Sequence, residues 1–245
     1  MNDDILLAVH DRIATLTFNR PASLNSLSLG SIQTLLQHLR DLSVRSDVRA
    51  LVLTGQGRGF CAGWQLDMDQ VPGIEGESLG VRQSHLMAEY FNPVIEALHD
   101  CPFPTLAAVN GYALGGGFEL ALACDRVYHL ALPDAPEQAP TIRVGDVNFG
   151  LYPMVTGQSR LQRRFYNELP AMDAVRARAG QALDADAAFA LGLVTSNPDD
   201  IDWADEIRLA LEERTSMSPD ALTGLEANLR FAQKENMATR IFGRL

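Results

Sequence analysis

The stretch NGYALGGGFELALACD, residues 110–125, contains three consecutive glycines. The residues before it, TLAAVN (105–110), predict a buried strand, and the residues after the glycines predict a helix. The first N–H groups of a helix lack partners within the helix and attract negative charge, and glycines let another group approach them closely. The stretch therefore predicts a junction between a strand and a helix that can bind an anion, with Glu119 in the first helical turn.

Three interpretations of this junction are open. A phosphate cradle is disfavoured, because the chain has no GxxxxGK[ST] and GYALGGG does not give GxGxxG. The second interpretation is an oxyanion hole, in which backbone N–H groups stabilise the charge that develops on a substrate carbonyl oxygen. The third is structural: the glycines let the helix pack closely on the sheet, and Glu119 caps the turn.

A second glycine loop favours the oxyanion hole. RGFCAGWQLD (58–67) also follows a short apolar strand, RALVLTG (49–55). Two such loops can each direct one N–H group at the same oxygen atom. The pair of loops is therefore more informative than either loop alone.

The remaining segments predict an α/β fold. ILLAVHDRIATLTF (5–18) predicts two strands around a turn at residues 11–12. Apolar residues at helical spacing predict helices at 28–45 and 81–100, the second one interrupted at Pro93. The last third of the chain predicts helices only. Alternating strands and helices are typical of a layered α/β core with mainly parallel strands.

In these segments the chain resembles the crotonase superfamily, the enoyl-CoA hydratase/isomerase family. Four segments carry the resemblance in order: NRPASLNSLS, RALVLTGQGRGFCAGWQLD, PTLAAVNGYALGGGFELALACD and LDADAAFALGLV. The resemblance implies an α/β fold with a crotonase-like ββα spiral core and a C-terminal helical region. Residues 1–190 would form the core with the acyl-CoA site. Residues 191–245 would form the helical region, which covers the pocket and assembles the chain into a homotrimer or homohexamer.

The resemblance also implies roles for individual residues. The thioester oxygen of an acyl-CoA would accept hydrogen bonds from the backbone N–H groups of Trp64 and Gly116. Glu119 falls on the family's first acid–base carboxylate. GDVNFGLYP (145–153) is the closest match to the family's PExxxGxxP segment and puts Asp146 on the second carboxylate. Further substrate-binding positions fall on Ala62, Gly63, Gln65, Leu66 and Gly115.

The sequence departs from the family pattern at some of these positions. Asp146 stands where hydratases usually have glutamate, and Gln65 stands where the first loop usually has aspartate. The stretch 132–144, just before Asp146, is longer than usual. The side chain of Trp64 has two open interpretations: it shapes the pocket for a flat or bulky acyl group, or it packs outward or in the core.

The resemblance implies an enzyme that stabilises a thioester enolate. The favoured hypothesis is hydration of an enoyl-CoA, which is lyase chemistry. Enoyl- or dienoyl-CoA isomerisation stays open, as do ring-modifying reactions and acyl groups held by an acyl carrier protein. A non-catalytic binding protein of the same fold is disfavoured, because both Glu119 and Asp146 are present. A NAD-linked dehydrogenase is disfavoured by the missing GxGxxG pattern.

Composition narrows the partners and cofactors. The net charge of −11 disfavours nucleic acid and anionic membranes as main partners. No apolar run approaches the ~20 residues that span a bilayer, and MNDDILLAVH lacks the positive charge of a signal peptide, so we expect a cytoplasmic protein. The five scattered histidines predict no metal site. No permanently bound cofactor is expected, since coenzyme A enters as part of the substrate; Lys234, the only lysine, is the candidate cation for its 3′-phosphate.

Two further features have structural interpretations. Cys61 lies in the first glycine loop and is interpreted as a small buried hydrophobic residue rather than a nucleophile. Arg160, Arg163 and Arg164 form a basic helical run, which is interpreted as a salt-bridged face rather than a phosphate site.

Overall fold

The structure is a computed structural model, and it describes residues 3–65, 78–150 and 158–230. Leu66 and Lys234, both expected to contact the substrate, lie outside the described residues. Within the described part, no helix is both long enough and apolar enough to cross a lipid bilayer.

The larger sheet has five strands in the order β1-β2-β3-β5-β7. Its strands are β1 (Ile5–His10), β2 (Ile13–Phe18), β3 (Ala50–Gly55), β5 (Thr105–Val109) and β7 (Arg126–His129). β1 and β2 are antiparallel, and they are joined by Asp11 and Arg12, whose φ angles of 47° and 68° make the tight turn. From β2 onward all pairs are parallel, which confirms the predicted arrangement.

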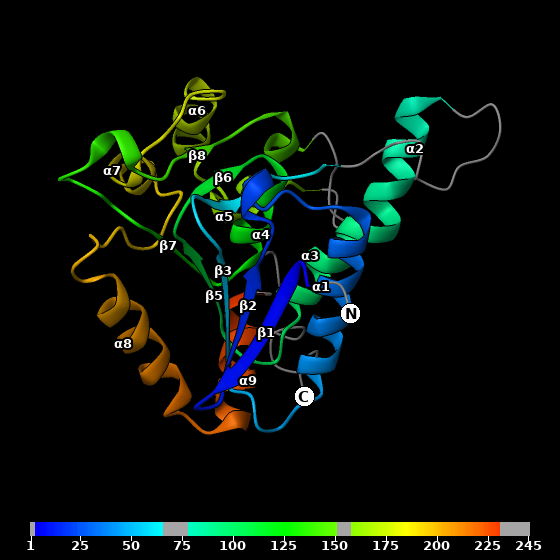
Figure 1. The fold of residues 1–245 in the computed structure, drawn as a ribbon, viewed down its shortest axis with the longest axis vertical. Coiled ribbons are helices and arrows are strands. Elements are labelled where there is room, and N and C mark those ends of the chain that lie inside the picture. The colour runs from blue at the N-terminus through cyan, green and yellow to red at the C-terminus, as the bar shows by residue number, and fades with distance from the viewer. Residues whose placement is uncertain (1–2, 66–77, 151–157, 231–245) are drawn as a thin grey trace.

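A smaller parallel sheet carries the two glycine loops. It consists of β4 (Gly59–Cys61), β6 (Tyr112–Leu114) and β8 (Ile142–Arg143), in the order β4-β6-β8. β4 follows β3 and β6 follows β5, so the small sheet lies at the carboxyl ends of these two strands (Figure 1). Asn110 joins the two strand ends, because it donates to Gly55 O at 2.7 Å and accepts from Gly55 N at 3.0 Å. The loops after β4 and β6 therefore leave the sheet side by side.

Helices cover both faces of the larger sheet. Those of the first half are α1 (Leu29–Ser43), α2 (Leu79–Leu86), the π-helical turn η2 (Met87–Phe91), α3 (Asn92–His99) and α4 (Gly116–Ala123). Those of the second half are α5 (Arg160–Arg164), α6 (Leu169–Ala177), α7 (Ala185–Ala190), α8 (Trp203–Thr215) and α9 (Pro219–Arg230). Short 3₁₀ turns are η1 (Pro21–Ser23), η3 (Pro136–Gln138) and η4 (Asp146–Phe149).

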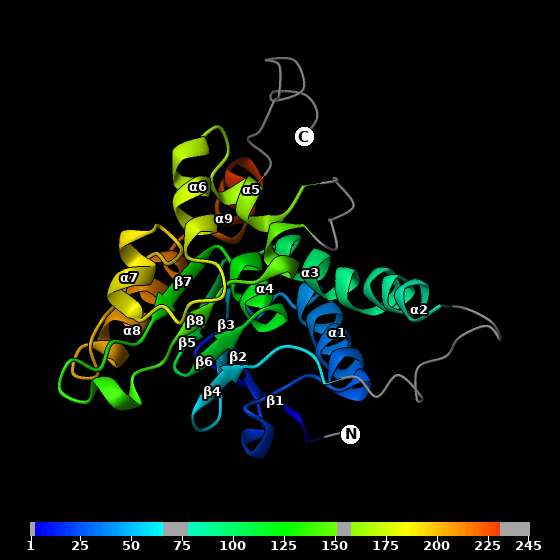
Figure 2. The same cartoon turned by 90° about the horizontal axis from the view of Figure 1, so that it is seen from above.

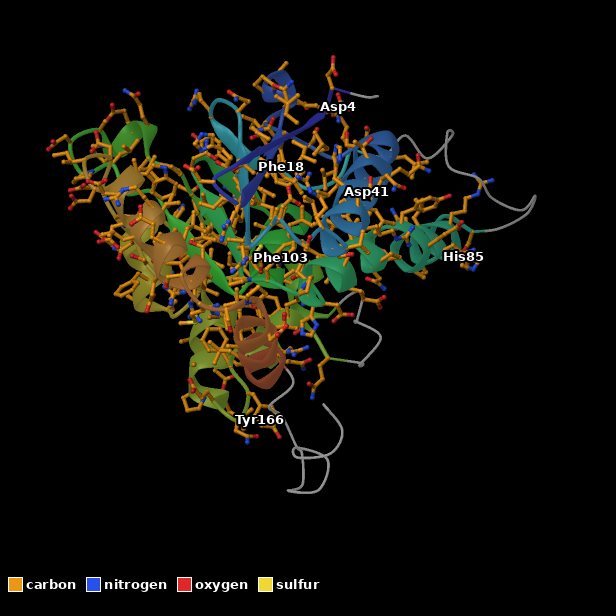
Figure 3. All side chains as sticks on the ribbon, turned by 90° about the horizontal axis from the view of Figure 1, so that it is seen from below. Asp4, Phe18, Asp41, His85, Phe103 and Tyr166 are labelled. Carbon is orange, nitrogen blue, oxygen red and sulfur yellow. The ribbon has the colours of Figure 1, made fainter. Side chains whose placement is uncertain are left out.

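The predicted helix at 81–100 is a chain of three segments. The π-helical turn η2 lies directly before Pro93, whose missing N–H and bulky ring disturb the regular helical hydrogen-bond ladder. α2 extends away from the rest of the molecule (Figures 1 and 2) and carries the exposed His85, whereas Phe18 lies among the packed side chains (Figure 3).

Strand alternation sorts the core into two layers. In β3, Leu51 and Leu53 belong to the main core under α1 and α3, whereas Ala50 and Val52 belong to a second cluster. That second cluster includes Leu211 of α8, which covers the opposite face of the sheet (Figures 1 and 2). Every second side chain of a strand points to the same face, so one short strand supplies both layers.

The C-terminal helices pack on the sheet-bearing part of the chain. Leu222 of α9 is 1% exposed, and Thr223 Oγ1 donates a hydrogen bond to Pro102 O at 3.0 Å. The helical prediction for the last third of the chain is confirmed within the described residues. The division at residue 190 and the assembly into trimers or hexamers stay predictions.

Candidate active site

The three glycines begin α4, and each has a separate reason to be glycine. Gly115 has φ +47° and ψ −110°, a conformation that side chains disfavour. A Cβ on Gly116 would overlap the indole of Trp64, and a Cβ on Gly117 would overlap the carbonyl oxygen of Cys61. Close packing thus accounts for two of the glycines, and backbone conformation for the third.

The first glycine loop is held by the residues before α1. Three backbone hydrogen bonds join residues 62–65 to residues 24–27: Ala62 N to Leu24 O at 3.0 Å, Leu27 N to Gly63 O at 2.7 Å, and Gln65 N to Leu27 O at 2.9 Å. Trp64 lies inside this ladder, but its own N–H has no partner among the described residues.

The two loops meet at the start of α4. Gly63 has φ +89°, and the position that its Cβ would occupy lies 3.4 Å from Gly116 N and 3.1 Å from Leu114 O. The first hydrogen bond of α4 runs from Glu119 N to Gly115 O at 3.0 Å. The N–H of Gly116 is therefore one of the unpaired donors of the helix N-terminus, and it has no partner among the described residues.

The indole of Trp64 forms an aromatic wall beside this junction. It packs against Phe91 with ring centroids 4.1 Å apart and an interplanar angle of 53°, and it covers Gly116. The side chain is half-buried, and its Nε1–H has no hydrogen-bond partner within residues 3–65, 78–150 and 158–230. The contact with Phe91 agrees with packing in the core. The contact with Gly116 agrees with a ring that shapes the proposed pocket.

Glu119 is a buried carboxylate behind the same junction. It is 8% exposed, and its Oε1 accepts a hydrogen bond of 2.7 Å from Asn148 Nδ2. Burial raises the pKa of Glu119 to about 7, although the Asn148 hydrogen bond and the positive charge of Arg160 both act to lower that pKa. At neutral pH this carboxyl group is therefore present in both the protonated and the ionised form.

Among the described residues, the carboxyl group of Glu119 is hydrogen-bonded to Asn148 and not to Asp146. Asp146 begins the turn η4 with its side chain exposed to solvent, and the member of η4 that reaches Glu119 is Asn148, two residues later. The sequence did not predict a role for Asn148, because an acid–base partner is expected to be a carboxylate and not an amide. The signal that could have found it is a single amide between two apolar residues, Val147 and Phe149.

Arg160 is buried, so its interpretation as part of an ion-paired face is wrong. It is 4% exposed, and its Nε and Nη2 have no hydrogen-bond partner among the described residues. Burial lowers its pKa to about 10, while the negative charges of Glu119 and Glu96 act to raise that pKa. The run RLQRR looked like a surface helix, since its sequence carries no sign that its first arginine points inward.

The remaining expected positions lie around the first loop. Gln65 is exposed, and its Oε1 accepts a hydrogen bond from Ser26 Oγ at 2.7 Å. Ala62 is half-buried in the backbone ladder described above. Cys61 is fully buried, and burial raises the pKa of its thiol to about 12, so it remains uncharged as the sequence suggested.

Comparisons with known proteins agree on one family. A family model described as enoyl-CoA hydratase/isomerase matches residues 9–243. A solved enoyl-CoA hydratase of Mycobacterium smegmatis superposes with a TM-score of 0.77 at 25% identity, covering 97% of this chain and 86% of that one.

Curated relatives match over shorter stretches. A benzoyl-CoA-dihydrodiol lyase of Aromatoleum evansii is 55% identical over 127 residues, which are 52% of this chain and 22% of that protein. A probable enoyl-CoA hydratase of Mycobacterium leprae is 37% identical over 185 residues, which are 75% of this chain and 59% of that protein. The matched regions thus span less than two thirds of each of these relatives.

Proposed function

Because the chain belongs to the enoyl-CoA hydratase/isomerase family, we propose that it is a lyase or hydratase acting on an unsaturated acyl-CoA thioester. The observation that carries the proposal is the position of Glu119. This buried carboxyl group has a pKa of about 7 and lies in the first turn of the helix that begins with the unpaired N–H of Gly116. A group with a pKa near the working pH is the one best suited to accept and return a proton.

In this proposal the N–H groups of Trp64 and Gly116 bind the thioester oxygen. Both donors lack partners among the described residues, and glycines bring the two loops together. Hydrogen bonds from the two N–H groups stabilise the negative charge of an enolate, and each such donor is worth about 3 kcal/mol of transition-state stabilisation. Gly63, Ala62, Gln65, Leu66 and Gly115 are the proposed neighbours of the bound thioester.

Glu119 is the proposed acid–base group in the step that adds or removes water. Its ionised form removes a proton from water as the water oxygen bonds to the β-carbon, and its protonated form returns a proton to the α-carbon. We assign Asp146 to the second carboxylate on the resemblance alone. Its exposed position makes it a group that can hold or orient the attacking water rather than a partner in direct contact with Glu119.

A ring-derived acyl group is a second candidate substrate. The observation that favours it is the pair Trp64–Phe91, which offers aromatic surface next to Gly116. Flat acyl groups stack on such rings more favourably than a straight alkyl chain does. The 55% identity to a benzoyl-CoA-dihydrodiol lyase over 127 residues supports the same candidate.

The proposal also includes a contact with coenzyme A and an oligomeric state. Lys234 is the proposed cation for the 3′-phosphate, and the proposed assembly is a homotrimer or homohexamer. Light scattering at micromolar concentration is expected to give a multiple of 26.8 kDa corresponding to three or six chains. A 26.8 kDa particle at that concentration would contradict the assembly.

A substrate screen tests the proposal. Purified protein is incubated with enoyl-, dienoyl-, aryl- and dihydrodiol-CoA esters, and with the same acyl groups on an acyl carrier protein, and the products are read by mass spectrometry. We expect a mass change of water or a cleavage product for at least one CoA ester, and a strongly reduced rate of the same reaction with Glu119→Gln. Binding of CoA esters without any turnover would instead support a non-catalytic binding protein.

A further inference from the structure

The side chain of Asn148 makes three hydrogen bonds in a fully buried position. Its Oδ1 accepts from Gly145 N at 2.9 Å, and its Nδ2 donates to Gly115 O at 3.0 Å and to Glu119 Oε1 at 2.7 Å. One side chain thus joins the turn η4 to the first residue before α4 and to the buried carboxyl group.

The orientation of this amide follows from its two backbone partners. The N–H of Gly145 can only donate a hydrogen bond, and the carbonyl of Gly115 can only accept one. The Oδ1 atom must therefore face Gly145, and the NH₂ group must face Gly115 and Glu119. Oε1 of Glu119 meets a donor whether the carboxyl group is ionised or protonated, so a proton on this carboxyl belongs on Oε2.

We propose that Asn148 is a positioning residue that confines the transferable proton of Glu119 to Oε2. This inference rests on the proposed function, in which Glu119 is the acid–base group. In the ionised state, Oε2 is the oxygen that takes a proton from water. In the protonated state, the Oε2–H bond breaks as that proton passes to the α-carbon of the substrate.

The hydrogen bond from Asn148 Nδ2 to Gly115 O gives Asn148 a positioning role at the proposed oxyanion hole as well. The carbonyl of Gly115 and the N–H of Gly116 belong to one planar peptide group. The donor on Asn148 polarises this peptide group and restrains its rotation, and Glu119 N donates to the same carbonyl at 3.0 Å. Asn148 therefore holds the acid–base carboxyl and the proposed oxyanion donor in one relative orientation.

The charged side chains near Glu119 act on its carboxyl group through their charge, whereas Asn148 is hydrogen-bonded to it. Arg160 of α5 acts on Glu119 through its charge, and Glu96 of α3 and Arg163 of α5 act on Arg160 in turn. Asp146, at the start of η4, is exposed. Among the described residues, Asn148 is the side chain with a direct hydrogen bond to the carboxyl group of Glu119.

The chain contains a matched control. Asn25 is 1% exposed and repeats the same bonding: its Oδ1 accepts from Arg20 N at 2.7 Å, and its Nδ2 donates to Gln56 O and Gly59 O at 2.9 Å and 2.6 Å. The acceptors of Asn25 are all backbone carbonyls. Asn148→Ala and Asn25→Ala therefore remove equivalent sets of bonds, and only the first removes a bond to a titratable group.

The titration of Glu119 provides a test that needs no substrate. The difference in unfolding free energy between each protein and its Glu119→Gln counterpart is followed from pH 4 to pH 9. We expect this difference to fall as pH rises from about 4.5 and to level off near pH 7 in the wild type. In Asn148→Ala the pH at which it levels off should rise by roughly one to two units, because a hydrogen bond to the ionised carboxylate is lost. Asn25→Ala is expected to lower stability at every pH and leave that upper limit in place. An unmoved upper limit in Asn148→Ala overturns the inference.

Asn148→Asp tests whether Asn148 positions the proton of Glu119 or only fills space. It also replaces Asn148→Ala if that variant does not fold. Aspartate keeps the shape and the acceptor for Gly145 N, but it draws the shared proton to Oε1. We expect kcat to fall further in Asn148→Asp than in Asn148→Ala, with KM little changed in both. A smaller loss in Asn148→Asp overturns the inference, since a structural role alone predicts that order. If the wild type turns over no CoA ester, the proposed function fails, and the titration still decides the role of Asn148.

Discussion

At the scale of single residues, the glycine triplet and Glu119 act together. Gly115 takes a backbone conformation that leaves the Gly116 N–H at the exposed start of α4, and Gly116 itself makes room for the indole of Trp64. Glu119 follows one helical turn after Gly115 and is buried against Asn148. The glycines thus allow the two loops to pack closely. Glu119 is buried behind them, and this burial raises the pKa of its carboxyl group.

Gly116→Ala tests this packing. Its Cβ would overlap the indole of Trp64, so we expect a loss of about 1–3 kcal/mol in unfolding free energy and a reduction in kcat/KM of ~10²-fold or more. Gly224→Ala in α9 is the matched control, because its Cβ would meet nothing within 4 Å, and it is expected to stabilise the helix by up to about 1 kcal/mol. Chemical denaturation and steady-state kinetics measure both. Equal behaviour of the two variants would refute the steric account of Gly116.

At the scale of elements, the alternation along β3 gives the sheet two covered faces. α1 and α3 bury one face, and α8 buries the other through Ala210 and Leu211. The candidate site lies at the carboxyl ends of β3 and β5, whereas α8 packs on one face of the larger sheet (Figure 1), so the stabilising role of α8 should be separable from catalysis.

Leu211→Ala tests this separation. Leu211 is 6% exposed against the sheet, and truncating such a residue costs about 2–4 kcal/mol of unfolding free energy. Leu209→Ala, on the same helix but 53% exposed, is expected to change stability by less than about 0.5 kcal/mol. Neither should change kcat at a temperature where both are folded. A clear loss of kcat in Leu211→Ala would show that α8 is coupled to the site.

The elements that the sequence predicted carry either apolar periodicity or a continuous run of buried residues. β1, β2, β3, β5 and α1 were predicted close to their observed bounds. The strands β4, β6 and β8 were not, because segments of two or three residues are too short to show alternation. The positions of Asn148 and Arg160 were also unpredicted, since their burial depends on α4 packing against η4 and α5, which no local pattern encodes.

At the scale of the whole molecule, two buried titratable groups act in opposite directions. Burial raises the pKa of Glu119 from 4.5 to about 7, so its contribution to stability is complete below pH 4.5 and is lost as pH rises to about 7. Burial lowers the pKa of His129 from 6.5 to about 4, so its contribution is complete above pH 6.5 and is lost as pH falls to about 4. Each shift corresponds to about 3 kcal/mol.

The pH dependence of unfolding distinguishes the two groups. We expect the wild-type curve to be nearly flat between about pH 4.5 and 6.5, because the two contributions offset each other there. Glu119→Gln should lose stability as pH falls through this window, and His129→Phe should lose stability as pH rises through it. Denaturant melts at half-unit pH steps measure the slopes. Parallel curves for the two variants would contradict the assigned pKa shifts.

The central claim is that Glu119 transfers protons at a CoA thioester, and the pH profile of kcat/KM tests it most directly. With the best CoA ester from the screen, the wild-type profile should contain an ionisation near pH 7, the pKa of Glu119. Glu119→Gln should bind the ester with little change, lower turnover by roughly 10²–10⁴-fold, and lack that ionisation. Asp146→Asn should keep the ionisation near pH 7 while lowering turnover. A Glu119→Gln enzyme with wild-type turnover and an unchanged profile would contradict the claim.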